Sequence, residues 1–563
     1  MVCCVELPSL LSVKGVTLTR KASNVTVLST VRRVARAMRR PRRIAAAGIL
    51  ICAASTALTA CTALPKAMEA SGPWQAGAGG GSPAASTRMP APAISVLAST
   101  APDALTAAFA ARLFGSAPVV VVAADNATAV SAAEKAAMSA HAPLLLTTAT
   151  SGAATAGAHT TASTVTLSAP LLTEIKDLRP RAVLAVGVAP ATLAARLPGV
   201  NVVTQAALLP ATGPAAPLSA VAVLVDRAKT AGKEAVAALT ATARVAGATV
   251  VTVNGYDPRA DPSAIEALAK ARPREVVAIG SGFGPASRLA ARVAVAETGI
   301  QLPGGGQRLF PGHRLVALYG SPGTPALGVL GDQDLTASIA RARATADLYR
   351  PLSKVPVIPT FEILATVAQG SPGYDGMYSY EEPVADIAPW VHAANAAGMY
   401  VILDLQPGRA NLLDQAKVYQ SLLTLPDVGL ALDPEWKLQP GQLPLRQIGS
   451  VSITEVNSVV DWLAALTARH HLPQKLLVLH QFRLSSIVDE SQLDTSNDDL
   501  AIIIHMDGQG TPGEKQQTWD AVTAAAPPKV FFGWKNFLVK DHPMISPQAT
   551  MAETPTPVMI SYQ

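Results

Sequence analysis

The sequence predicts an α/β protein in which two parallel-sheet domains follow one another, over residues 92–300 and 314–563. Short, continuously apolar segments alternate with helical patterns, as expected of parallel strands that are covered on both faces. A nine-residue segment recurs about 93 residues further along the first domain. Eight strand candidates then follow in the second domain.

The first domain is predicted to contain a duplicated, Rossmann-like α/β unit. Its recurring segments are "RPRAVLAVG" (179–187) and "RPREVVAIG" (272–280), which are identical at six of nine positions. Each is followed by a Pro-Ala pair and a helical pattern, which indicates two related units. The candidate strands of this domain are 117–125, 142–148, 181–187, 219–226, 247–255 and 274–280.

The second domain is predicted to be a TIM-barrel-like (β/α)8 domain. Eight strands separated by helical patterns in about 250 residues have the size and order of this fold. An open doubly wound sheet is the alternative. Glycine and proline interrupt all periodicity before the domain, so residues 301–313 are predicted to be a linker. The strand candidates are 314–320, 356–363, 399–406, 428–435, 475–482, 500–507, 529–534 and 557–562.

The positive charge of the chain is confined to its N-terminus. Residues 1–60 hold ten Lys/Arg and one acidic residue, and the other 503 residues carry a formal charge of −3. A nucleic-acid partner requires a basic surface on the folded domain, so no nucleic-acid binding is predicted.

Residues 38–60 are typical of an export signal. Arginines precede an apolar run, and "LTAC" ends at Cys61. This box resembles the bacterial lipobox, which implies lipidation of Cys61 and anchoring to the outer face of the plasma membrane; an uncleaved signal anchor is the alternative. Residues 1–37 are then expected to be a wrongly assigned or disordered extension before a start at Met38, and 61–91 are expected to form a flexible tether.

The cysteines and the composition agree with export. All four cysteines lie at or before Cys61, so no disulfide is predicted in the body of the protein. The alanine- and proline-rich composition resembles that of secreted actinobacterial proteins.

Residues 100–290 resemble the second type of cell-wall-binding repeat of secreted bacterial proteins. The similar segments are "VVVVAAD", "SAAEKAAMSAHAPLLLTT" and "LTEIKDLRPRAVLAVG". The chain departs from the family at Val188, where a second glycine is usual. The resemblance implies that the protein binds cell-wall polysaccharide or peptidoglycan.

No cofactor is predicted. The segment "GSGFG" (280–284) brings three glycines to the end of a strand, but its spacing is not that of a dinucleotide-binding loop. A tight turn between strand and helix explains it.

The ends of the barrel strands are polar, and active sites of TIM barrels lie at these ends. Glu435 is predicted to be a general acid, with Asp433 and either Asp404 or Asp507 as partner carboxylates. Paired carboxyl groups with separated pKa values are the machinery of glycoside hydrolysis. Residues predicted to bind substrate are Glu362, Gln406, Trp436, His480, His505, Trp534 and Lys535.

The second domain also resembles glycoside-hydrolase-like barrels, some of which carry Asp-x-Glu at the end of strand four. Ala431 and Lys535 stand where two of the longer signatures require acidic residues. Three functions stay open: a hydrolase of envelope polysaccharide, a non-catalytic cell-wall-binding lipoprotein, and a metal-dependent hydrolase. The last would use His480, His505, Asp433 and Asp507, since imidazole and carboxylate groups bind divalent metals.

Overall fold

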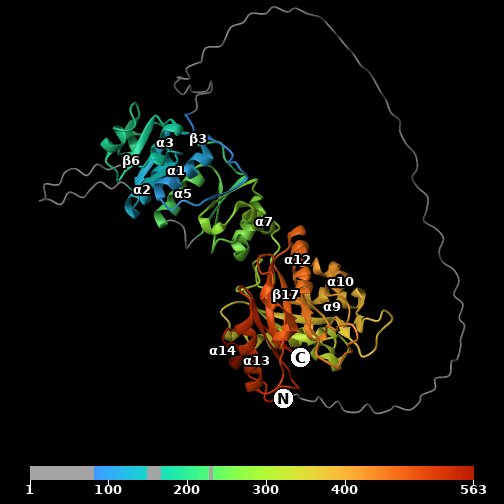
Figure 1. Cartoon of the computed structure of the whole chain (residues 1–563). Helices are drawn as coiled ribbons and strands as arrows, with labels where there is room; N and C mark the ends of the chain where they lie inside the picture. The colour runs from blue at the N-terminus through green and yellow to red at the C-terminus, as the bar shows by residue number, and fades with distance from the viewer. Residues whose placement is uncertain (1–81, 149–166, 227–231) are drawn as a thin grey trace, which may run out of the picture. The chain divides into compact units, whose positions relative to one another are not determined.

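The computed structural model describes residues 82–148, 167–226 and 232–563 (Figure 1). The predicted signal peptide and the lipidation site Cys61 lie outside these residues. Within the described parts of the chain, no helix is long and apolar enough to cross a membrane.

The first of three major sheets has four parallel strands in the order β5-β4-β6-β7. Strands β4, β5 and β6 are mainly apolar and buried, because helices separate them in the chain and cover the sheet, whereas the edge strand β7 is only partly buried. Its strands are β4 (Val119–Ala124), β5 (Leu144–Thr147), β6 (Ala182–Val186) and β7 (Asn201–Val203), and its helices are α1 (Pro102–Leu113), α2 (Ala127–Ser139), α3 (Ala169–Leu178) and α4 (Pro190–Ala194).

The second sheet has the order β2-β10-β8-β9 and is also parallel. Its strands are β2 (Ile94–Leu97), β8 (Val221–Asp226), β9 (Thr249–Val253) and β10 (Glu275–Ile279), and its helices are α5 (Lys233–Val245), α6 (Pro262–Ala271) and α7 (Ala286–Ala296). In each sheet, three strands that follow one another in the chain lie in the spatial order second, first, third. They are β5-β4-β6 in the first sheet and β9-β8-β10 in the second. In the sequence, the edge strand β2 precedes all the strands of the first sheet.

The two recurring segments have the same local structure. They form β6 and β10, the third of the three consecutive strands in their sheets. The arginine that precedes each segment's proline ends a helix in the left-handed conformation, with φ of 52° at Arg179 and 41° at Arg272. A residue in this conformation ends the helix, and the chain then continues into the following strand.

The third sheet is a closed barrel of eight parallel strands, so the open-sheet alternative is wrong. The order is β11-β21-β20-β19-β17-β15-β14-β12, and β12 pairs again with β11. Each predicted strand overlaps an observed one, although β12 and β20 extend beyond the predicted ends. The observed strands are β11 (Arg314–Gly320), β12 (Val357–Ala368), β14 (Tyr400–Leu405), β15 (Val428–Leu432), β17 (Lys475–Gln481), β19 (Leu500–Met506), β20 (Phe531–Asn536) and β21 (Met559–Tyr562). The fold of this domain is therefore TIM-barrel-like.

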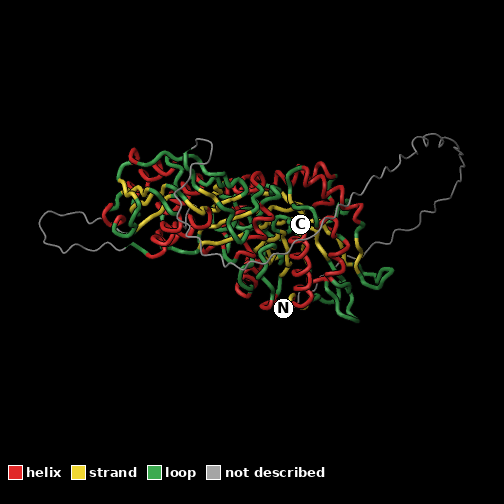
Figure 2. The backbone as a smooth tube through the Cα atoms, turned by 90° about the horizontal axis from the view of Figure 1, so that it is seen from above, coloured by secondary structure: helices red, strands yellow, loops and turns green. Residues whose placement is uncertain are grey.

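Helices lie around the barrel strands (Figure 2). An α-helix follows each barrel strand from β11 to β20 except β17. Residues 482–499, between β17 and β19, contain only 3-10 turns and the two-residue strand β18 (Ile487–Val488). The helices of the domain are α8 (Leu335–Asp347), α9 (Val384–Ala396), α10 (Leu412–Val418), α11 (Gln420–Leu423), α12 (Ile453–Arg469), α13 (Pro512–Ala525) and α14 (Pro547–Ala552).

The segment predicted as a linker, 301–313, packs against the barrel, although Gly304, Pro311 and Gly312 in it are exposed. Leu302, Leu309 and Phe310 pack with inward-facing residues of the barrel, such as Leu315 and Leu476, in one apolar cluster. These inward residues lie at the N-terminal ends of their strands, so the segment closes that end of the barrel.

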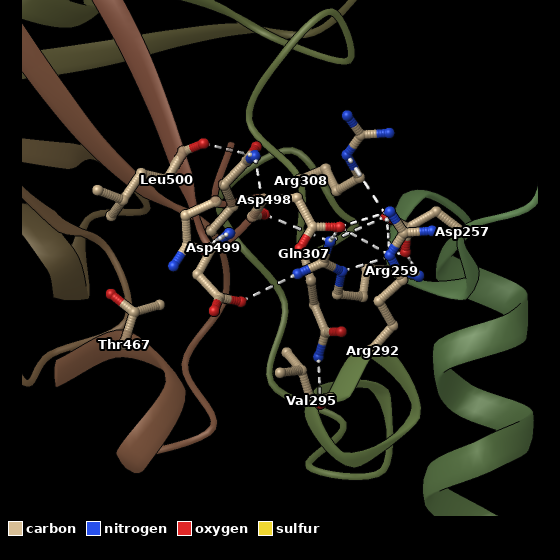
Figure 3. A network of polar contacts seen from close by, with 12 residues as sticks. Asp257, Arg259, Arg292, Val295, Gln307, Arg308, Thr467, Asp498, Asp499 and Leu500 are labelled. Carbon is tan, nitrogen blue, oxygen red and sulfur yellow. Dashed lines mark hydrogen bonds and ion pairs between the residues drawn. The ribbon is translucent and has the colours of Figure 1, made fainter. Parts of the chain in front are cut away.

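A polar network joins residues near α7 to the loop before β19 (Figure 3). The side chain of Arg259 is 1% exposed. Its guanidinium lies 3.0 Å from the carboxylate of Asp257 and 3.1 Å from that of Asp498. Arg292 also binds Asp498. Buried charges are tolerated only when they are paired in this way.

Candidate active site

The inward-facing residues at the C-terminal ends of the barrel strands form a polar layer. Below them the barrel interior is mainly apolar. Side chains alternate along each strand, so each strand has one inward-facing residue near its C-terminal end. These residues lie beside those of the neighbouring strands and form one layer. The layer contains Tyr319, Glu362, Asp404, Asp433, His480, His505 and Lys535.

A cavity of about 370 Å³ opens above this layer. Six of the predicted site residues line it: Gln406, Asp433, Glu435, Trp436, Asp507 and Lys535. Strand β15 ends at Leu432, and Pro434–Trp436 form a 3-10 turn. Glu435 therefore reaches the cavity from a turn and not, as expected, from an extended strand.

Three carboxyl groups meet in the cavity. One oxygen of each of Asp433, Glu435 and Asp507 lies within 4.8 Å of the others. Oδ1 of Asp433 and Oδ1 of Asp507 are buried without a hydrogen-bond partner. Since a buried polar atom is costly when unpaired, these oxygens are available to hydrogen-bond a ligand.

The surroundings shift the pKa values of two of these groups in opposite directions. Burial and the nearby Asp507 raise the pKa of Glu435 to about 7. Burial alone would raise the pKa of Asp507, but its contact with His480 outweighs burial and lowers that pKa. Glu435 is thus suited to hold a proton and Asp507 to stay ionised. Burial and Glu435 raise the pKa of Asp433 well above its usual range.

His480 links Asp507 to a second carboxylate below the cavity. Its Nε2 donates to Oε1 of Glu362 at 3.0 Å, and its Nδ1 lies 3.3 Å from Oδ2 of Asp507. Burial by itself lowers the pKa of His480, but the Glu362 carboxylate and the contact with Asp507 outweigh it and raise the pKa well above its usual value. The imidazolium is therefore held between two acidic groups.

The other histidine has the opposite character. His505 is buried beside His480, and its Nε2 lies 2.7 Å from Oγ of Ser561. Burial and the charge of His480 lower the pKa of His505 well below its usual value, so it is neutral.

Tyr319 and Lys535 form the other side of the layer. The hydroxyl of Tyr319 donates to Oδ2 of Asp404 at 2.8 Å, and Nζ of Lys535 lies 3.7 Å from the centre of the Tyr319 ring. Lys535 is inward-facing and 3% exposed, and it lines the cavity. It provides a cation close to the carboxyl groups.

Not every predicted residue reaches the cavity. Asp404, Glu362, His480 and His505 are buried below it and do not line it. The expectation that Trp534 binds substrate is wrong. Trp534 is 1% exposed, packs against Trp519 outside the barrel, and donates to Asn536. It neighbours Lys535, and adjacent residues of a strand face opposite sides.

Several cavity residues were not predicted. Tyr319 lies next to the end of β11, where strand-end reasoning could have identified it. The others come from loops, from helix α13 (Thr518) or from the C-terminal end of the barrel domain, and the apolar pattern does not reveal that they reach the cavity. They are Phe482, Gly508, Gln509, Thr518, Phe537 and Gln563.

A metal ion would find a different set of ligands from the predicted one. Among the described residues, the acidic and imidazole groups close enough to share an ion are Asp433, Glu435 and Asp507. His480 and His505 are not among them, because their Nε2 atoms are directed to Glu362 and Ser561. Three carboxylates suit a hard cation such as Mg²⁺, Ca²⁺ or Mn²⁺.

The fold and the site define a TIM-barrel-like protein with a carboxyl-rich cavity at the C-terminal ends of its strands. Comparisons with protein-family models, with curated proteins and with solved structures found no match to this chain.

Proposed function

We propose that the barrel hydrolyses glycosidic bonds, with Glu435 as general acid and Asp507 as nucleophile. The observation that carries this proposal is the approach of the carboxyl groups of Glu435 and Asp507 in one cavity, with oxygens within 4.8 Å. The pKa of Glu435 is raised to about 7 and that of Asp507 is lowered, which separates their roles. Enzymes that retain the anomeric configuration hold the two carboxyl groups about 5–5.5 Å apart, and inverting enzymes about 6.5–9.5 Å apart. The separation favours the retaining mechanism.

The reaction has two steps. Asp507 attacks the anomeric carbon while Glu435 transfers its proton to the leaving oxygen, which breaks the glycosidic bond and forms a glycosyl ester. A water molecule then gives a proton to Glu435 and attacks the same carbon. The ester bond breaks, and the sugar and the ionised Asp507 are released.

Asp507 is a better nucleophile than the other expected partners. Asp433 has a pKa raised well above its usual range, so it holds a proton. Asp404 is fully buried below the cavity and accepts a hydrogen bond from Tyr319. The remaining cavity residues suit a sugar: aromatic rings stack on its apolar faces, and amides bind its hydroxyls. Trp436, Phe482, Gln406 and Gln509 supply these groups.

The place of action follows from the sequence. The lipobox-like segment at Cys61 supports export and a lipid anchor on the outer face of the plasma membrane. The resemblance of residues 100–290 to cell-wall-binding repeats supports a duplicated Rossmann-like domain that holds the protein on envelope polysaccharide or peptidoglycan. The barrel would then act on a glycan of the envelope.

Incubation of the protein with purified cell-wall fractions tests this function, with released saccharide and bound protein scored separately. Release of saccharide is expected from the unaltered protein but not from the variants Glu435→Gln and Asp507→Asn. The exposed carboxyl groups of Glu381 and Asp414 provide matched controls, since Glu381→Gln and Asp414→Asn leave the cavity unchanged. Binding without any release would favour the non-catalytic alternative.

The metal-dependent alternative is favoured by one observation, the convergence of three carboxyl oxygens in the cavity. A bound cation would ionise all three groups and could activate water. Dialysis against a chelator distinguishes the two mechanisms. Unchanged hydrolysis is expected for the acid–nucleophile pair, whereas loss of hydrolysis that added Mn²⁺ or Ca²⁺ restores would favour the metal.

A further inference from the structure

Apolar side chains gather on the loops that surround the cavity. Of the seventeen large apolar side chains that are exposed in the described residues, eleven lie in the loops that follow β12, β15, β17 and β20. Soluble proteins seldom concentrate such side chains in one region without a partner. We call six of them the apolar rim: Tyr374, Leu445, Ile448, Leu484, Leu538 and Val539.

Three of the loops are joined to one another by hydrogen bonds. The backbone N–H of Arg409 donates to Met377 in the loop after β12, and its side chain donates to Gln442 in the loop after β15. Arg483, at the end of β17, donates to the carbonyl of Ile448 at 2.9 Å. The loops after β12, β15 and β17 therefore form one continuous margin.

The fourth loop is connected to the cavity itself. The backbone N–H of Leu538 donates to Gln563 at 2.9 Å, and Gln563 and Phe537 both line the cavity. The side chains of Leu538 and Val539 are 41% and 75% exposed. Apolar surface thus begins where the polar cavity ends.

The charge of these loops indicates which partner fits. The full loops, residues 369–383, 433–450, 482–499 and 537–546, contain eleven acidic and four basic residues, so they carry no excess of positive charge. An anionic surface would select for lysine and arginine here, and an uncharged hydrocarbon would not. A second protein seated on the rim would also block the cavity that the substrate must enter.

Building on the glycosidase function proposed above, we propose that the substrate is an amphiphilic glycan. Its sugar occupies the cavity, and a hydrocarbon chain attached to the leaving oxygen lies on the apolar rim. The chain adds binding by removing apolar surface from water, both its own and that of the rim. The six rim side chains therefore contact the hydrocarbon, and the residues that line the cavity contact the sugar.

Pairs of octyl and methyl glycosides test the proposal, because each pair shares a sugar and differs only in the hydrocarbon. Octyl and methyl glycosides of glucose, galactose, mannose and N-acetylglucosamine are compared below micelle-forming concentrations. For a hydrolysed sugar, kcat/KM is expected to be at least about tenfold higher for the octyl compound. The double variant Leu445→Ser/Val539→Ser should lose this preference and retain its rate on the methyl compound.

The matched control changes two exposed leucines away from the cavity, Leu208 and Leu348. Leu208→Ser/Leu348→Ser should keep the preference for the octyl compound. Equal rates on octyl and methyl glycosides, or the same loss in the control, would overturn the proposal. Self-association of the protein that Leu445→Ser/Val539→Ser abolishes would instead assign the rim to a second copy of the chain.

Binding separates this proposal from the catalytic one. Calorimetry on the Glu435→Gln protein measures the affinity for octyl and methyl glycosides without turnover. Tighter binding of the octyl compounds supports the rim even where the unaltered protein hydrolyses nothing, an outcome that would sink only the hydrolase function. Hydrolysis without a preference for octyl glycosides would support the hydrolase function and refute the proposal that the substrate is amphiphilic.

Discussion

Nδ1 of His480 lies 3.3 Å from Oδ2 of Asp507, and Nε2 of the same ring donates to Glu362. This relationship places a buried cation against the proposed nucleophile. His480 does not line the cavity, so it acts through Asp507 as a positioning residue.

His480→Gln should move the acid limb of the pH–rate profile to higher pH. Activity requires an ionised Asp507, and loss of the imidazolium raises the pKa of that carboxyl group. A rise of about one unit corresponds to about 1.4 kcal/mol of lost stabilisation of the charged form. His392→Gln, on the exposed side of α9, serves as the control. An acid limb that stays in place would show that His480 does not influence Asp507.

Glu435 should set the alkaline limb of the same profile. Its pKa is raised to about 7, so the proton needed by the leaving oxygen is lost as pH rises through this value. Glu435→Gln should remove that limb and reduce kcat by about 10²–10⁴. The reduction should be smaller for nitrophenyl glycosides, whose leaving group needs no proton. An equal reduction on both kinds of substrate would contradict the role of general acid.

Lys475 should make stability rise with pH. Burial lowers its pKa from 10.5 to about 7, and its Nζ donates to the carbonyls of Leu425 and Val428. Between these two values the unfolded chain binds a proton that the folded protein does not, so the free energy of unfolding increases as pH rises, by up to about 1.4 kcal/mol per unit. Urea unfolding at pH 7 to 10 measures the slope. Lys475→Met should flatten it, and an unchanged slope would refute the assignment.

Gly533→Ala should destabilise the barrel through His505. These residues are paired neighbours on β20 and β19, and a Cβ at position 533 would overlap the His505 ring. Overpacking of this kind costs about 1–3 kcal/mol. The double variant Gly533→Ala/His505→Ala should be less destabilised than the sum of the two single variants, as a double-mutant cycle by thermal unfolding would show. Additive effects would mean that the two residues do not compete for space.

Arg259→Ala should also destabilise the protein. The change leaves the buried carboxyl group of Asp257 without its closest cation, and removal of one partner of a buried pair costs about 3–5 kcal/mol. The exposed pair Arg341–Asp332 provides the comparison, because Arg341→Ala should cost at most about 1 kcal/mol. Equal effects in chemical unfolding would show that the network around Arg259 has no special role.

The strands of the protein could be predicted because they are buried on both faces. Continuous apolar runs such as 476–479 and 500–504 contain no alternation, and they predict the positions of the barrel strands. The short edge strands β2 and β7 were missed, since they are half-buried and lack a continuous apolar run.

The candidate site was predictable in part, for the same physical reason. Asp433, Glu435 and Asp507 follow apolar strands directly, and the C-terminal ends of parallel strands meet in a barrel. Their different roles depend on partners from distant strands, such as His480 for Asp507, which linear spacing does not reveal. Trp534 was misassigned because the alternation of side chains along β20 was not applied to it.

Residues 301–313 pack against the barrel, so the barrel domain does not begin at its first strand. The floor of the barrel is encoded by the segment that precedes its first strand, through Leu302, Leu309 and Phe310. A polypeptide that began at Arg314 would contain all eight strands and yet expose the interior at one end. The sequence that encodes this barrel domain therefore starts before its first strand. A recombination event that exchanged the domain would have to include residues 301–313.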